Sequence, residues 1–169
     1  MTTTNPVLGI IGGGQLGSML ASAAKKFKIK TIVLSDDLKA PAKNFCDEII
    51  ITDYKKIKKI DDFINKVDLV TFEFENIPFK VLEYILKHKP IFPKPSINQL
   101  LQNRFTEKKF VNNEGIKTTN YVLIKNKSDI LDNETLLPGF LKTCTLGYDG
   151  KGQYIINNKD EIDELNIDF

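Results

Sequence analysis

A glycine-rich segment near the end of the 169-residue chain carries the residues with the clearest potential for chemistry. It contains the sequence GYDGKGQ, from Gly147 to Gln153, in which three glycines surround a carboxylate and an ammonium group. Glycines allow positive φ and close folding over a ligand, and lysine supplies a mobile cation. Lys142 adds a second ammonium group just before the loop. The segment therefore predicts a loop that closes over phosphates, although it lacks the GxxxxGK[ST] pattern of a P-loop.

A second glycine-rich turn, GGGQLG, lies between a predicted strand and a predicted helix near the N-terminus. Such a turn presents the free N–H groups of a helix start to an anion. Asp36 lies nineteen residues beyond Gly17, where an acidic residue could bind a ribose hydroxyl of a dinucleotide. A single phosphate would satisfy the same N–H groups, and Gln15 could hydrogen-bond a ligand. A dinucleotide site, a monophosphate site and a structural turn therefore stay open.

Two further groups of polar residues are candidates for ligand binding. Glu73 and Glu75 follow a predicted strand in TFEFENIP, and so lie at the carboxyl edge of the sheet, where open α/β sheets bind ligands. They could accept hydrogen bonds from an amine or hydroxyls, or they are exposed loop carboxylates. Arg104 is the only arginine among 24 basic residues, and its planar fork binds phosphate or carboxylate at two points. The alternative is an arginine on a helix surface without a ligand.

Composition sets broad limits on the class of protein. Hydrophobic content of 41%, charged content of 27% and a net charge of +2 are typical of a soluble globular protein, and they predict neither a nucleic-acid partner nor a membrane partner. No apolar run approaches the roughly 20 residues that cross a bilayer, and the N-terminus does not resemble a signal peptide. The prediction is a cytoplasmic protein. Cys46, Cys144 and the single histidine, His88, predict reduced thiols and no metal site.

The hydrophobic pattern predicts alternating strands and helices over residues 1–95. The predicted strands are 7–11, 30–34, 48–51, 69–72 and 91–92, and the predicted helices are 15–27, 54–67 and 78–88, with Pro78 in a first turn. The first helix is predicted from an apolar stripe of Leu16, Met19, Leu20, Ala23 and Phe27. Alternation of this kind implies parallel pairing with helical crossovers, and hence a doubly wound α/β sheet.

The remaining residues predict a different organisation. Ser96 and Thr106 are predicted helix caps within a helical linker at 96–118. Short strands are predicted at 121–124, 140–142 and 153–156, followed by a weak helix at 160–165. The sequence thus predicts a Rossmann-like domain at 1–95, the linker, and an incomplete antiparallel unit at 119–169 that carries the glycine-rich loop.

Four motifs together resemble a known family. GGGQLG, TFEFEN, NRFTEKKF and LKTCTLGYDGKGQ, in this order and spacing, closely resemble the N-terminal portion of 5-(carboxyamino)imidazole ribonucleotide synthetase, also called the phosphoribosylaminoimidazole carboxylase ATPase subunit. This family belongs to the ATP-grasp superfamily. The resemblance implies a pre-ATP-grasp, Rossmann-like α/β domain followed by the start of an ATP-grasp α+β domain.

The resemblance also implies a reaction. The family is a carbon–nitrogen ligase of purine biosynthesis in which ATP activates bicarbonate as carboxyphosphate. The amine of 5-aminoimidazole ribonucleotide then takes up the carboxyl group, and ADP and phosphate are released. Mg²⁺ is implied by the family, with ligands outside this chain, and a homodimer is suggested. We therefore expect a truncated chain that is inactive by itself.

Residue roles follow from the same resemblance. Arg104 and Lys142 look like nucleotide-phosphate contacts, and Asp149 looks like the catalytic group beside the reacting amine. The loop over the phosphates comprises Gly147, Tyr148, Asp149, Gly150, Lys151, Gly152 and Gln153. The side that binds aminoimidazole ribonucleotide comprises Gly14, Gln15, Leu16 and Glu73. The first turn then becomes a monophosphate site, and Asp36 loses its cofactor role.

Two other functions stay open from the sequence. One is an NAD(P)-binding oxidoreductase domain built on GxGxxG and Asp36. The other is a non-catalytic nucleotide-binding remnant, or a binding module that another chain completes. Loss of nicotinamide-cofactor binding on replacement of Asp36 would favour the oxidoreductase.

Overall fold

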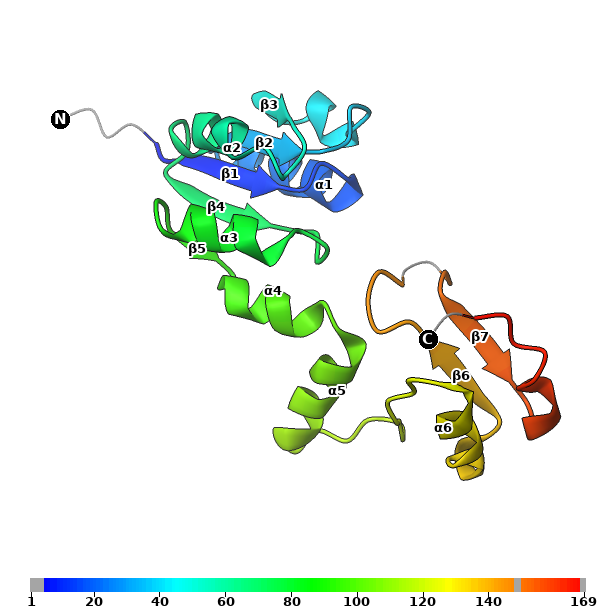
Figure 1. The fold of residues 1–169 in the computed structure, drawn as a ribbon. Coiled ribbons are helices and arrows are strands. Elements are labelled where there is room, and N and C mark those ends of the chain that lie inside the picture. The colour runs from blue at the N-terminus through cyan, green and yellow to red at the C-terminus, as the bar shows by residue number, and fades with distance from the viewer. Residues whose placement is uncertain (1–4, 148–149, 168–169) are drawn as a thin grey trace. The chain divides into compact units, whose positions relative to one another are not determined.

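The computed structural model describes residues 5–147 and 150–167 of the chain (Figure 1). Two compact units divide it between Gln99 and Leu100, within the helix α4 (Pro95–Leu101). The first unit contains a five-stranded sheet and the second a two-stranded sheet. Among the described residues, none of the helices combines the length and the apolar character that a membrane span requires.

The sheet of the first unit is entirely parallel. Its strands are β1 (Val7–Ile11), β2 (Lys30–Ser35), β3 (Glu48–Ile51), β4 (Leu69–Phe72) and β5 (Ile91–Phe92), in the order β3-β2-β1-β4-β5. Each is a short apolar run rich in β-branched residues, which suits a strand buried on both faces. In the register of the sheet, Ile11 pairs with both Leu34 and Phe72. The predicted doubly wound α/β fold is therefore confirmed.

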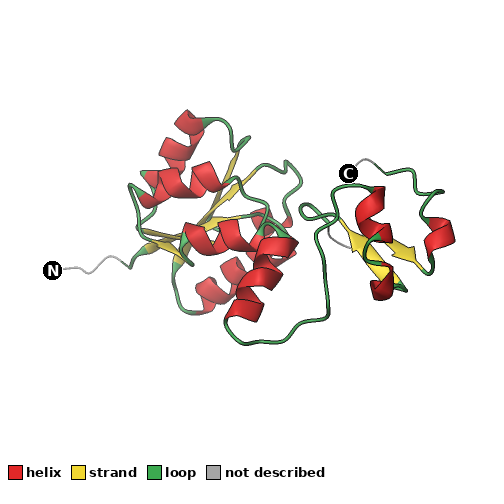
Figure 2. Cartoon of the chain, turned by 60° about the horizontal axis from the view of Figure 1, so that its bottom comes forward, coloured by secondary structure: helices red, strands yellow, loops and turns green. Residues whose placement is uncertain are grey.

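Helices cover both faces of this sheet (Figure 2). Consecutive strand residues point to opposite faces, so Ile11 joins one core and Ile10 the other. The larger core includes Phe63 of α2 (Ile57–Ile64) and Leu82 of α3 (Phe79–Leu86). The smaller core combines Ile10 with Ala21 of α1 (Gln15–Lys26) and a residue of the 3₁₀ turn Pro41–Asn44. All three helices are shorter than predicted, and Pro78 is the N-cap of α3, outside its first turn.

The apolar stripe that predicts α1 lies on its exposed side. Met19 is 61% exposed and Phe27, just past the helix end, is 77% exposed. The buried residues of α1 are small: Gly17, Ser18, Ala21 and Ala24. Small side chains let the helix axis approach the sheet closely, because a Cβ on Gly17 would already lie 2.3 Å from the carbonyl oxygen of Gly12. The face of α1 that is buried is therefore the one with small residues, because only that face can pack closely, and the larger apolar residues stay exposed.

The second unit is built around one β-hairpin whose two strands are connected by a long loop. Its strands β6 (Gly139–Lys142) and β7 (Gln153–Ile156) pair antiparallel, in register from Gly139 opposite Ile156 to Lys142 opposite Gln153. The helices are α5 (Arg104–Asn113) and α6 (Lys127–Leu131), and 3₁₀ turns cover Glu134–Leu136 and Lys159–Glu161. A small core of Ile130, Ile156 and Ile162 joins α6 to β7 and the last turn.

Local details of this region differ from the sequence predictions. Residues 121–124 form no strand, and 160–165 contain only the end of a 3₁₀ turn. Helix α4 begins at Pro95, so Ser96 is inside it. Asn103, rather than Thr106, caps α5, since its side-chain oxygen accepts from the N–H groups of Phe105 and Thr106 at 3.0 and 3.1 Å. The hydroxyl of Thr106 instead donates to the carbonyl of Asn103 at 2.8 Å.

Candidate functional site

The first glycine-rich turn joins β1 to α1 at the carboxyl edge of the parallel sheet. Gly12 has a φ of 108°, and its N–H donates to the carbonyl of Leu34 at 2.9 Å. A Cβ on Gly13 would lie 2.7 Å from Ser35 Oγ, and one on Gly17 would meet the backbone of Gly12. Because the turn is enclosed by β2 and by its own backbone, side chains at these positions would collide with fixed atoms.

The carboxylate of Glu73 lies against this turn. Glu73 follows β4, and a Cβ on Gly12 would lie 2.6 Å from Glu73 Oε1. The backbone groups of Gly14 and Gly17 donate hydrogen bonds to this carboxylate. Burial raises the pKa of Glu73, the two hydrogen bonds partly oppose that increase, and the charge of Glu75 adds to it. Two of the N–H groups where the sequence predicts a monophosphate, those of Gly14 and Gly17, therefore face the carboxylate of Glu73.

The other predicted residues of the turn face solvent. Gly14 and Gln15 are exposed, and the side chain of Leu16 is 56% exposed. The turn thus brings Gly14 together with Glu73 and leaves Gln15 at the open start of α1. These residues can offer a carboxylate oxygen and a side-chain amide to a polar ligand.

Tyr54 is a neighbour of Glu73 that the sequence did not indicate. Its side chain is 6% exposed, and burial, followed by the charges of Asp36 and Glu73, raises the pKa of its phenol. The sequence predicts Tyr54 only as the start of a helix, whereas the structure places it before α2, in the larger core. Its proximity to both carboxylates depends on the order of β3, β2, β1 and β4, which local patterns do not contain.

The second glycine-rich loop connects β6 to β7. Thr143 follows β6, and its N–H donates to the carbonyl of Gly152 at 2.8 Å. Gly150 and Gly152 have φ values of 79° and 63°, and Leu146 also has a positive φ of 60°. Gly150 and Gly152 thus adopt the positive φ that the sequence predicts for glycines of this loop. The predicted residues Tyr148 and Asp149 lie outside the described residues.

Arg104 reaches this loop from the first turn of α5. Its backbone N–H donates to the carbonyl of Cys144 at 2.8 Å, and its guanidinium donates to the carbonyl of Gly147. The exposed Lys142 ends β6 with its ammonium group 5.5 Å from the ring centroid of Phe140. Lys151 is exposed on the other side of the loop. The second unit thus brings Arg104 together with Gly147 and places two lysines beside the same loop, an arrangement that suits polyanionic phosphates.

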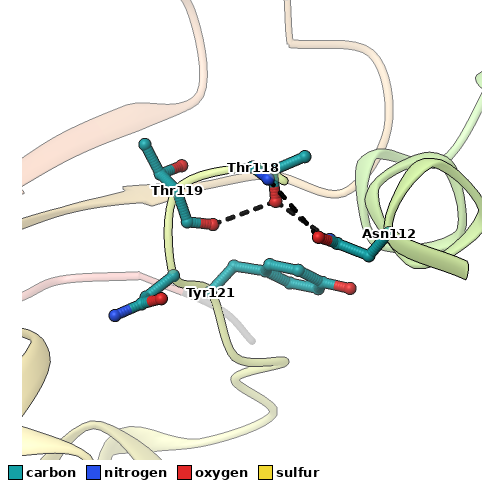
Figure 3. Close-up of a pocket in the computed structure, with 5 residues that line it drawn as sticks. Asn112, Thr118, Thr119 and Tyr121 are labelled. Carbon is teal, nitrogen blue, oxygen red and sulfur yellow. Dashed lines mark hydrogen bonds between the residues drawn. The ribbon is translucent and has the colours of Figure 1, made fainter. Parts of the chain in front are cut away.

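A pocket of about 310 Å³ in the second unit belongs to neither loop (Figure 3). It is lined by Asn112, Thr118, Thr119, Asn120 and Tyr121. The Asn112 amide donates to the hydroxyl of Thr118 at 2.9 Å and accepts from its N–H at 3.3 Å, while that hydroxyl donates to the carbonyl of Thr119 (Figure 3). These polar groups satisfy one another, so we do not assign the pocket to the site.

Among residues 5–147 and 150–167, no group of three or more His, Cys, Asp or Glu side chains could hold a metal ion.

A doubly wound domain with a glycine-rich turn, preceding an antiparallel pair that carries a second glycine loop, defines the pre-ATP-grasp class with the start of an ATP-grasp domain. Residues 5–102 match the ribonucleotide synthetase preATP-grasp domain, and residues 109–167 match the ATP-grasp domain. The chain belongs to the ribonucleotide synthetase preATP-grasp family.

Individual relatives agree with this assignment. The N5-carboxyaminoimidazole ribonucleotide synthase of Brucella melitensis is 37% identical over 167 residues, which cover 94% of this chain and 44% of that protein. The ADP complex of the Staphylococcus aureus N5-carboxyaminoimidazole synthetase has a TM-score of 0.88 at 35% identity, over 97% of this chain and 45% of that one.

The Aspergillus clavatus synthase in complex with ADP and 5-aminoimidazole ribonucleotide has a TM-score of 0.80 at 26% identity, over 95% of this chain and 43% of that one. The resemblance predicted from the four motifs is confirmed by these matches. The chain spans less than half the length of the relatives that it matches.

Proposed function

We propose that this chain is the N-terminal portion of a cytoplasmic, ATP-dependent carbon–nitrogen ligase that carboxylates 5-aminoimidazole ribonucleotide with bicarbonate in purine biosynthesis. The observation that carries the proposal is the contact between Arg104 and Gly147, 43 residues apart, which joins two residues that the resemblance assigns to nucleotide binding. The 37% identity to a synthase of this activity supports the same function.

The nucleotide side of the proposed reaction is assigned to the second unit. Arg104, Lys142 and Lys151 supply positive charge for the phosphate oxygens, and the loop from Gly147 to Gln153 supplies backbone N–H groups. These charges would stabilise the phosphoryl group as a bicarbonate oxygen attacks it and ADP leaves. In the second step the amine nitrogen bonds to the carboxyl carbon, phosphate leaves, and Asp149 is proposed to accept the proton from nitrogen.

The ribonucleotide side is assigned to the first unit, at Gly14, Gln15, Leu16 and Glu73. The resident carboxylate of Glu73 sharpens this assignment, because a carboxylate accepts hydrogen bonds and repels phosphate. We infer that this turn contacts ribose hydroxyls or the amine through Glu73 and Gln15, rather than the phosphate through its N–H groups.

The Mg²⁺ implied by the family supplies charge neutralisation at the phosphates when it is bound. No step in this chain is assigned to it. The chain spans less than half the length of its relatives, so the proposal includes negligible synthetase activity for the 169-residue chain alone. ADP formation that depends on aminoimidazole ribonucleotide and bicarbonate would contradict that part.

The partner proposed for the first unit is a second copy of the chain. Its support is the exposed apolar stripe of α1, in which Met19 is 61% and Leu20 is 38% exposed. Such a stripe on a helix surface is typical of an interaction site. Sedimentation of the wild-type chain as a dimer, and of Met19→Glu as a monomer, is the expected result. A monomeric wild-type chain would contradict the proposal.

Ligand binding tests the proposed function directly. The purified chain is titrated with 5-aminoimidazole ribonucleotide, ADP and NADH, and the ligand-induced shifts of backbone amide signals are mapped. Aminoimidazole ribonucleotide is expected to shift the signals of residues 12–17 and 73, and ADP those of 104 and 142–153. Saturable NADH binding that Asp36→Asn abolishes would instead support the oxidoreductase alternative.

A further inference from the structure

Three residues of the second glycine loop lie together, Thr143 and Gly152 at its base and Gly147 from its middle, and they are here called the loop neck. The last residue pair of the hairpin is Lys142 opposite Gln153. Thr143 comes directly after Lys142 and Gly152 directly before Gln153, so these two residues form the next pair, at the start of the loop. The N–H of Thr143 donates to the carbonyl of Gly152 at 2.8 Å. The backbone of the hairpin thus continues one step beyond its strands.

The side chain of Thr143 occupies the space that the two glycines leave. A Cβ on Gly152 would lie 2.6 Å from Thr143 Oγ1 and 2.9 Å from its Cγ2. A Cβ on Gly147 would lie 2.8 Å from the same Oγ1. Contacts this short are strongly repulsive between carbon and oxygen atoms. One threonine at the start of the loop therefore packs against two glycines, Gly147 from the middle of the loop and Gly152 from its end.

Gly147 is also held by a second contact. Its carbonyl accepts the guanidinium hydrogen bond of Arg104, and the backbone N–H of Arg104 donates to the carbonyl of Cys144. Gly147 therefore lies between a side chain of the hairpin and the start of α5. A shift of Gly147 away from Thr143 would change its contact with Arg104 as well.

We propose that Thr143 is a positioning residue for the glycine loop, setting the separation of Gly147 and Gly152 and thereby holding the Gly147 carbonyl at Arg104. Threonine suits this role because its two branches on Cβ restrict χ1, which fixes the hydroxyl and the methyl at once. The effect on nucleotide binding rests on the proposed function. The packing of the loop neck is independent of the proposed function.

A double-mutant cycle in the 169-residue chain tests the packing. Gly147→Ala is expected to lower the hydrogen-exchange protection of the residue-143 amide roughly tenfold, because the new Cβ collides with Thr143 Oγ1. Adding Thr143→Ala removes that oxygen and is expected to restore most of the protection. If the double variant is as poorly protected as Gly147→Ala alone, Thr143 does not determine the requirement for glycine, and the proposal fails.

Gly152→Ala serves as the matched control. Gly152 has a φ of 63°, which strains any other residue whatever space surrounds it. Adding Thr143→Ala should therefore restore less protection to Gly152→Ala than to Gly147→Ala. Thr143→Ser, which keeps the hydroxyl but lacks the methyl, is expected to have an intermediate effect. Equal restoration at both glycines would show a general loosening of the hairpin and would also contradict the proposal.

ADP titration of the same variants separates this inference from the proposed function. If both hold, Thr143→Ala weakens ADP binding and Thr143→Ser weakens it less, in the order of their exchange protection. If the wild-type chain does not bind ADP, the nucleotide role of the loop fails while the cycle still decides the role of Thr143. If ADP binds equally to all variants with altered exchange, the neck does not position the nucleotide contacts, and that part of the proposal is wrong.

Discussion

The two loops of this chain are both rich in glycine, but side chains of opposite charge lie against them. At the first, backbone groups of Gly14 and Gly17 donate hydrogen bonds to the carboxylate of Glu73. At the second, a glycine carbonyl accepts a hydrogen bond from the guanidinium of Arg104. Glycine spacing therefore predicts where the backbone can turn and approach closely, whereas the neighbouring elements decide which charge faces the loop. We therefore expect the first loop to bind hydrogen-bond donors of a ligand and the second to bind anions.

The largest expected effect comes from the enclosed backbone of the first loop. Gly17→Ala would gain about 1 kcal/mol of helix propensity, but its Cβ would lie 2.3 Å from a backbone oxygen that cannot move independently. Because overpacking of this kind typically costs about 3 kcal/mol, we expect a net loss of about 2 kcal/mol in the free energy of unfolding. Urea denaturation followed by circular dichroism measures it.

Lys25→Ala, on the exposed side of the same helix, is the control for this variant. It should leave the free energy of unfolding within about 0.5 kcal/mol of the wild-type value. A Gly17→Ala variant that is as stable as this control would show that the first turn is not enclosed.

The second prediction concerns the cation at the other loop. Arg104→Lys keeps the positive charge but removes the planar fork that donates to the Gly147 carbonyl. We expect roughly tenfold lower hydrogen-exchange protection in residues 143–152, with no change in the sheet of the first unit. Asn103→Ala, which removes the cap of α5 without removing the guanidinium, separates fraying of the helix from loss of the loop contact. Equal exchange in Arg104→Lys and wild type would contradict a role for the fork.

The third prediction uses the raised pKa of Glu73, whose ordinary value is 4.5. A carboxyl with a higher pKa in the folded chain than in the unfolded chain stabilises the fold most when it is protonated. Its contribution is complete below pH 4.5 and is lost as pH rises through the folded pKa. The wild-type chain should therefore lose stability relative to Glu73→Gln as pH rises above 4.5.

Unfolding of the two proteins at matched pH values measures this difference, since the other carboxyl groups are shared. A difference that does not change with pH would show that the Glu73 carboxylate is fully solvated. Glu75→Gln, two residues further along the chain, is the control for a general change of charge at this edge.

Much of the fold could be predicted because it is encoded locally. The apolar runs of β1 and β2 are bounded by glycine or polar residues, and alternation with helices leaves few alternatives to a parallel sheet. The cap residue of a helix is harder to predict from sequence, because Asn103 and Thr106 are both good capping residues. The structure assigns the cap to Asn103 because the hydroxyl of Thr106 donates back to two carbonyls.

The candidate site could be predicted only as a list of residues. The position of Glu73 beside Gly12 follows from the register that pairs Ile11 with Phe72. This contact joins strands that are separated along the chain by two helices, two strands and a 3₁₀ turn. The packing of Thr143 between two glycines likewise depends on the closed hairpin. Sequence motifs identify both loops, but the partner that fills each loop is a tertiary property.

The smallest expected effect distinguishes the two uses that the sequence allows for the first loop. If its ligand is a ribonucleotide contacted through Glu73, Asp36→Asn should change the affinity for 5-aminoimidazole ribonucleotide by less than about threefold. Asp36 is exposed just after β2, and solvent and salt screen an exposed charge. Glu73→Gln should weaken the same affinity by roughly tenfold or more, since it replaces a charged acceptor by a neutral amide. Isothermal titration of both variants gives the ratio. A larger loss for Asp36→Asn than for Glu73→Gln would return the loop to dinucleotide binding, whereas the expected order makes the resident carboxylate the feature that separates the first loop from the second.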